Sequence, residues 1–153
     1  MSETSIAHSP RVLTGEGRAW LQARLDAAHA RLDRVARHLD DEHTPDLLAE
    51  RQQIEEHIEE LSSALRVAVA PGEISDDPEL VELGDEVQVR FPDGSVETFL
   101  VVDPLEAGMD ERRTSAESPL GRAVLGHRVG DRVTVAAPAG VFSCTILERR
   151  RLT

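Results

Sequence analysis

Three consecutive acids, Asp40, Asp41 and Glu42, are the residues of this sequence best suited to chemistry, and we call them the tip acids. Carboxylate oxygens are ligands that Mg²⁺ prefers, and one or two loop carboxylates with substrate phosphates make a common magnesium site. Carboxylates donated to a phosphoryl-transfer centre can help recruit its second metal ion. Adjacent side chains point in different directions along a helix or a strand. We therefore expect these acids to approach a metal ion rather than to hold one alone.

The alternative interpretation is that the tip acids are a solvated turn. They follow a helical pattern, and negative charge at the C-terminal end of a helix is unfavourable. Residues that break such a local rule without visible compensation are typical of functional sites. The sequence therefore favours functional acids and leaves the solvated turn open. His38 and His43 flank the acids without a cysteine, and we expect them to be solvent-facing rather than metal ligands.

Two apolar series with alternating spacings of three and four residues predict the helices that position these acids. Thr44 and Pro45 are typical of a helix start, so a second helix begins close behind the first. A short connection makes consecutive helices antiparallel neighbours. We expect an antiparallel α-helical coiled-coil hairpin over residues 13–70, with its tip near residue 43. Its seam consists of Leu21, Leu25, Ala28, Leu32, Val35 and Leu39, followed by Leu47, Arg51, Ile54, Ile58, Leu61 and Leu65.

The rest of the chain has the period of β-strands. The expected fold class is α+β, in which an antiparallel sheet with one short helix follows the hairpin. The expected organisation is a flexible N-terminus (1–12), the coiled-coil hairpin (13–70), a linker (71–79) and a C-terminal domain (80–153). The expected strands are 85–91, 95–102, 131–137 and 140–148, with a polar loop over 103–117 and a short helix over 119–126 after Ser118.

Composition narrows the possible partners. The net charge of -12 argues against free binding to duplex DNA or anionic lipid, although a basic protein partner fits it. Cys144 has no partner for an internal disulfide, and we expect it to be buried in a strand. Because the sequence has no signal peptide pattern and no membrane-spanning apolar run, we expect a cytoplasmic protein without membrane contact.

Two segments resemble a known family. The sequence "TGEGRAWLQARL" opens the hairpin, and "SPLGRAVLGHRVGD" at residues 118–131 precedes the last strands. Together they resemble the Gre transcription factors of bacterial RNA polymerase. The resemblance implies an FKBP-like C-terminal domain that docks at the polymerase secondary channel, and a coiled coil whose acidic tip approaches the active-site Mg and stimulates cleavage of backtracked RNA. It also implies that the polymerase-docking residues are Ser118, Pro119, Leu120, Gly121 and Arg122.

The tip departs from the family pattern. Cleavage-competent Gre factors carry an Asp and a Glu three residues apart, with a Tyr beyond. Here His43 follows Asp40 by three residues, Thr44 follows Asp41 by three, and the chain contains no Tyr. We therefore expect inhibition or modulation of transcription. Three alternatives stay open: a cleavage-stimulating elongation factor, a coiled-coil interaction or chaperone module unrelated to polymerase, and a shorter-coiled polymerase binder related to the regulator of nucleoside diphosphate kinase.

The sequence does not point to an enzyme. An FKBP-like prolyl isomerase site needs aromatic residues including Tyr and Trp, and residues 71–153 hold only Phe91, Phe99 and Phe142. There is also no nucleophile arrangement or glycine-rich phosphate loop. We expect a monomer without a cofactor of its own, near polymerase-bound Mg when in complex, with bacterial RNA polymerase as partner and only indirect nucleic-acid contact.

Overall fold

The computed structural model describes residues 11–72 and 77–151. It divides the chain into two compact units: Arg18–Val67, and Met1–Gly17 together with Ala68–Thr153. Most of the N-terminus predicted to be flexible, and part of the predicted linker, lie outside the described residues. Residues 11–14 are described, and Val12 forms an isolated bridge with Val69 in the second of these units.

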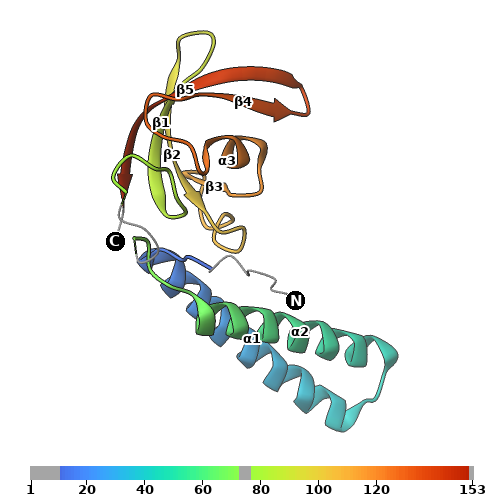
Figure 1. Ribbon diagram of the computed structural model, residues 1–153. Helices are drawn as coiled ribbons and strands as arrows, with labels where there is room; N and C mark the ends of the chain where they lie inside the picture. Colours follow the sequence, from blue (N-terminus) through green and yellow to red (C-terminus); the bar gives the residue numbers. More distant parts are fainter. Residues whose placement is uncertain (1–10, 73–76, 152–153) are drawn as a thin grey trace, which may run out of the picture. The chain divides into compact units, whose positions relative to one another are not determined.

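The helical unit contains most of α1 (Gly15–Asp41) and α2 (Pro45–Val67), which run side by side (Figure 1). At 1.5 Å per residue the longer helix extends about 40 Å. One buried cluster joins the predicted seam residues Ala28, Val35, Leu39 and Ile54, with Leu32, Leu47 and Ile58 packed against it. The predicted antiparallel hairpin is therefore confirmed, because residues from both apolar series meet in one core.

The hairpin is closed by a few polar contacts at its ends. The Thr44 hydroxyl accepts a hydrogen bond from the Leu47 backbone N–H at 3.2 Å, so Thr44 caps α2 as expected. At the other end the Arg18 guanidinium donates to the Leu65 carbonyl oxygen at 3.1 Å, which satisfies a carbonyl in the last turn of α2. Arg51, which interrupts the seam, is half-exposed and pairs with Glu55 at 3.5 Å.

The second unit is built on a curled five-stranded sheet with the order β3-β2-β1-β5-β4 (Figure 1). The predicted hairpins and the helix after Ser118 are confirmed. Alternate residues of the strands join α3 in one apolar core that includes Val87, Val101, Val124, Val133 and Ile146. The elements are β1 (Asp85–Arg90), β2 (Val96–Val102), β3 (Arg113–Ser115), α3 (Pro119–Val124), β4 (Arg132–Ala137) and β5 (Gly140–Arg151).

Segment 103–117 differs from the predicted polar loop, because it contains β3, which pairs with β2 in parallel. The sheet is therefore mixed rather than wholly antiparallel. Three residues are too few to show a strand period, and the segment holds the buried charged residues Glu106 and Arg113. Their pairing makes the burial possible.

Within the described residues, no helix is long and apolar enough to cross a membrane.

Candidate functional site

The tip acids lie where α1 ends. Asp40 and Asp41 are the last residues of the helix, and the backbone N–H of Glu42 still donates to the His38 carbonyl oxygen at 2.8 Å. All three acids are exposed. Helical geometry turns successive side chains by about 100°, so Asp40 and Asp41 point in different directions. The structure therefore presents three carboxylates around the end of a helix rather than on one face.

The tip acids have no structural partners that would explain their charge. Among the described residues, none of the three carboxylates takes part in a hydrogen bond or an ion pair. Negative charge at this end of a helix is unfavourable, and no ion pair within the described residues compensates it. In residues 11–72 and 77–151 no group of three or more His, Cys, Asp or Glu side chains is arranged to hold a metal ion. These acids are free to act on another molecule.

A shallow hollow of about 500 Å³ lies beside the tip, between α1 and α2. Glu42 lines this hollow, whereas Asp40 and Asp41 do not. Arg31, Arg34 and His38 line the side formed by α1, and Arg31 pairs with Glu50 across the hairpin at 3.4 Å. Glu42 therefore shares a surface with basic side chains of α1 that does not include Asp40 or Asp41.

The predicted docking residues lie around α3, which begins after Ser118. The Ser118 hydroxyl accepts a hydrogen bond from the Gly121 N–H at 3.1 Å and donates one to the Ser115 carbonyl oxygen at 2.7 Å. It is therefore an N-cap whose side chain is also fixed to the preceding segment. Pro119 and Arg122 are exposed, and Leu120 packs against the core of the sheet.

Gly121 is buried and supports the segment. A Cβ added there would lie 2.1 Å from the Ser115 carbonyl oxygen. Only glycine permits this approach of α3 to the backbone before it. Of the five predicted docking residues, Pro119 and Arg122 thus have side chains open to a partner, whereas Gly121 holds them in place.

A buried charged cluster was missed by sequence reasoning. Glu106 is fully buried, accepts from the Thr14 backbone N–H at 3.2 Å and from Arg113 Nε at 3.2 Å, and also accepts from the Thr14 hydroxyl. The Thr14 hydroxyl in turn accepts from the Gly17 N–H at 3.0 Å and so caps α1. Periodicity carries no signal for such contacts. The only signal for this cluster in the sequence is that Glu106 and Arg113 are close together in the predicted polar loop.

Two further buried titratable groups are explained by the fold. Asp85 is fully buried and is bound by Arg149 Nε at 2.8 Å and Arg151 Nε at 3.1 Å. Cys144 is buried in the core of the sheet, as expected, and burial raises the pKa of its thiol.

Known proteins resemble both the C-terminal module and the whole chain. Residues 76–150 match the family described as transcription elongation factor, GreA/GreB, C-terminal domain. Transcription elongation factor GreA of Chloroflexus aggregans is 34% identical, with 95% of this chain and 100% of that protein covered. GreA of Geobacillus kaustophilus is 40% identical over 57% of this chain and 56% of its own.

Among solved structures, Gfh1, the GreA factor homolog of Thermus thermophilus, is 28% identical and covers 93% of this chain and 99% of its own, with a TM-score of 0.42. Gfh1 of Thermus aquaticus is also 28% identical over 93% of this chain and 99% of its own, with a TM-score of 0.43. The GreA of Chloroflexus aggregans shows the family, because its whole length aligns with nearly the whole of this chain. The protein therefore belongs to the GreA/GreB family of transcription elongation factors.

Proposed function

We propose that this protein binds bacterial RNA polymerase at the secondary channel through its C-terminal module and inserts the acidic hairpin tip toward the active-site Mg, where it inhibits or modulates transcription. Family membership supports a role in transcription elongation. The observation that carries the proposal is that the tip acids are exposed and without partners among the described residues. A structural role would pair or cap these carboxylates.

The chemistry at the tip supports modulation more than cleavage. Cleavage requires a metal ion and a water to be held in a defined geometry. Asp40 and Asp41 point apart, and Glu42 belongs to a different surface beside Arg34 and His38. Such acids attract a loosely held Mg²⁺ or compete for it. They do not form the Asp and Glu pair, three residues apart, that the resemblance associates with cleavage.

Docking is proposed to use the exposed side chains at the start of α3. Pro119 and Arg122 are open to a partner, while Ser118 and Gly121 fix the backbone that carries them. A rigid segment loses little conformational freedom on binding, which favours affinity. We also propose that this C-terminal module is FKBP-like.

Transcript cleavage stimulation is the second candidate, and one observation favours it. The GreA of Chloroflexus aggregans, named as an elongation factor, aligns over its whole length. A coiled-coil interaction or chaperone module has weaker support, because such a module would need an exposed apolar patch near the tip. Leu48 is the large apolar residue exposed there, and 41% of its surface is accessible. One exposed leucine is ordinary for a protein surface.

The experiment combines two assays with the same bacterial polymerase. RNA cleavage is measured on stalled elongation complexes, and abortive products are measured during initiation, each with and without this protein. The proposal predicts fewer abortive products, or a changed pattern of them, without faster cleavage. Faster cleavage alone would support the second candidate. Unchanged products in both assays, with binding demonstrated, would contradict both.

A further inference from the structure

Two arginines of the C-terminal module have no partner that explains their position. Arg90 ends β1 and Arg132 begins β4, and both are exposed. In the described part of the chain neither takes part in an ion pair or a side-chain hydrogen bond. Most other arginines of this module, such as Arg113 and Arg149, are bound to carboxylates. An acidic protein that leaves two cations unpaired on one sheet raises the question of what they bind.

The sheet register brings these two arginines together. Thr145 of β5 is opposite Arg90 on one side and opposite Arg132 on the other. The three side chains therefore form a row across adjacent strands, in which the arginines are two strands, or about 10 Å, apart. Their neighbours Val89 and Val133 point into the apolar core. Alternation thus places the row on the opposite face of the sheet.

This row lines a shallow hollow of about 530 Å³. Ser143 and Thr145 of β5, the strand between β1 and β4, contribute hydroxyl groups to its lining, and Pro92 and Val141 contribute apolar side chains. Val141, the second residue of β5, is 72% exposed at this border. Guanidinium groups bind carboxylates through paired, charge-assisted hydrogen bonds. The hollow therefore has the chemistry to bind acidic side chains that alternate with apolar ones.

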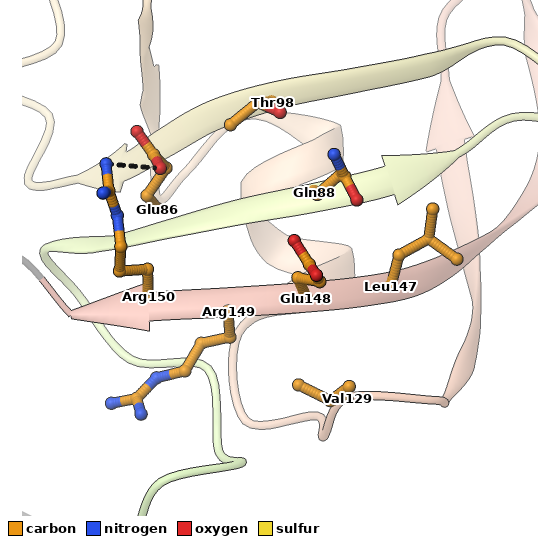
Figure 2. Close-up of a pocket in the computed structure, with 8 residues that line it drawn as sticks. All are labelled: Glu86, Gln88, Thr98, Val129, Leu147, Glu148, Arg149 and Arg150. Carbon is orange, nitrogen blue, oxygen red and sulfur yellow. Dashed lines mark ion pairs between the residues drawn. The ribbon is translucent and has the colours of Figure 1, made fainter.

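Farther along, the same face of the sheet carries acidic side chains, and Arg149 and Arg150 lie beside them. A second hollow is lined by Glu86, Gln88, Thr98 and Glu148, whose side chains extend from one face of β1, β2 and β5 (Figure 2). Glu86 pairs with Arg150 at 2.9 Å. Among the described residues Glu148 forms no ion pair. It is opposite Gln88, two residues before Arg90 on β1, a separation of about 7 Å along the strand.

This alternation of charge identifies the class of partner. A nucleic-acid backbone carries negative charge throughout, so it would meet Glu148 directly beyond the arginines, on a protein with a net charge of -12. A protein segment can instead place acids opposite Arg90 and Arg132 and a base opposite Glu148. We propose that this face of β4, β5 and β1 docks a protein segment that carries acidic residues at one end and a basic residue at the other. The acidic residues would pair with Arg90 and Arg132, and the basic residue with Glu148. The surface includes none of the tip acids and none of residues 118–122.

The test uses the full-length protein labelled with ¹⁵N and titrated with three peptides of about eight residues, a length that spans the two hollows at 3.3 Å per residue. Each peptide alternates valine with charged residues: one has glutamates followed by a lysine, one has only lysines, and one has only glutamates. The first peptide is expected to bind most tightly and to shift the amide signals of Arg90, Arg132 and Thr145. Absence of binding by this peptide would overturn the proposal.

Matched variants make the test specific. Arg90→Gln with Arg132→Gln should weaken the first peptide at least about tenfold, because two charge-assisted bonds are lost. Arg37→Gln with Arg66→Gln removes the same charge from the helical unit and should leave binding unchanged. Glu148→Lys should reverse the preference in favour of the all-glutamate peptide. Equal loss of binding in the two double variants would overturn the proposal.

A single-stranded oligothymidine and inorganic phosphate serve as the remaining probes. Binding of either as tightly as the first peptide would show a general anion site, and the proposal would be wrong. The assay contains no polymerase, so its failure is distinguishable from failure of the proposed transcriptional role. Unchanged thermal unfolding of the Arg90 and Arg132 variant is expected, because neither side chain has an internal partner among the described residues.

Discussion

Glu106 accepts a hydrogen bond from the backbone N–H of Thr14 at 3.2 Å, although 92 residues separate them in the sequence. Thr14 is the residue that caps α1, through its hydrogen bond with the Gly17 N–H at 3.0 Å. Both residues belong to the same compact unit, so within that unit a buried carboxylate holds the residue that caps α1. Arg113, itself almost fully buried, neutralises that carboxylate.

Removal of this carboxylate is expected to destabilise the C-terminal module strongly. Glu106→Ala leaves Arg113 buried without its main partner and removes a hydrogen-bond acceptor from Thr14. Breaking one partner of a buried ion pair typically costs about 3–5 kcal/mol. Urea denaturation measures the free energy of unfolding. Glu111→Ala, at an exposed position, is the control and should change it by about 0.5 kcal/mol or less. A similar small change for both variants would contradict the structural role of Glu106.

The close approach of α1 to Glu106 gives a second prediction, in which one substitution has opposite effects in two backgrounds. A Cβ at Gly17 would lie 2.0 Å from the Glu106 carboxyl carbon. Gly17→Ala should therefore destabilise the native chain by about 1–3 kcal/mol through overpacking. In the Glu106→Ala background that space is open, and alanine favours a helix over glycine by about 1 kcal/mol.

The same denaturation measurement on the four chains forms a double-mutant cycle. Gly17→Ala should lower the free energy of unfolding in the first background and raise or preserve it in the second. If the substitution has the same effect in both backgrounds, the two residues are not coupled as the structure indicates.

These contacts also mark the limit of prediction from the sequence. The hairpin was predictable because its apolar series and the cap at Thr44 are local signals that the cluster around Val35, Leu39 and Ile54 confirms. The strands flanking residues 92–94 were predictable for the same reason. The pairing of Glu106 with Thr14 depends on the folded path of the chain, and no periodicity encodes it. The short strand β3 is defined by its parallel pairing with β2. Three residues are too few to show this pairing in the sequence.

The candidate site divides in the same way. The exposure of the tip acids follows from their position between two helices, so it could be expected from the sequence. The separation of Glu42 from Asp40 and Asp41 required the structure, because it depends on which side chains line the hollow beside Arg34. The facing row of Arg90 and Arg132 depends on their common neighbour Thr145, and strand order was not predictable from strand patterns.

Cys144 should be unreactive in the folded protein. Burial raises the pKa of its thiol, so less thiolate is present at a given pH, and the thiolate is the nucleophile. Labelling with a thiol reagent at pH 8 should be much slower than in urea-unfolded protein. Because the folded pKa is raised, the unfolded chain loses this proton first as pH rises above about 8.5, and the fold loses stability there. Equal labelling rates for folded and unfolded protein would contradict the burial of Cys144.

The proposed docking segment is tested by changing a side chain that has no ion pair or side-chain hydrogen bond within residues 11–72 and 77–151. Arg122 is exposed on α3, and Arg122→Glu reverses its charge without removing the Ser118 cap or the Gly121 contact. Affinity for bacterial RNA polymerase should fall by at least about tenfold, which corresponds to one charge-assisted contact. Arg66→Glu at the end of α2 is the control. Equal affinities for native protein and the Arg122 variant, measured by a direct binding assay, would exclude this residue from docking.

We propose that the tip acids act on the polymerase active centre, whereas other residues provide binding. The most direct test measures polymerase affinity and transcript output together for the variant with alanine at Asp40, Asp41 and Glu42, with alanine at Glu56, Glu59 and Glu60 of α2 as the control of equal charge. We expect the tip variant to bind as the native protein does and to lose its effect on transcription, while the control keeps both. A tip variant that still changes transcription as the native protein does would contradict the account.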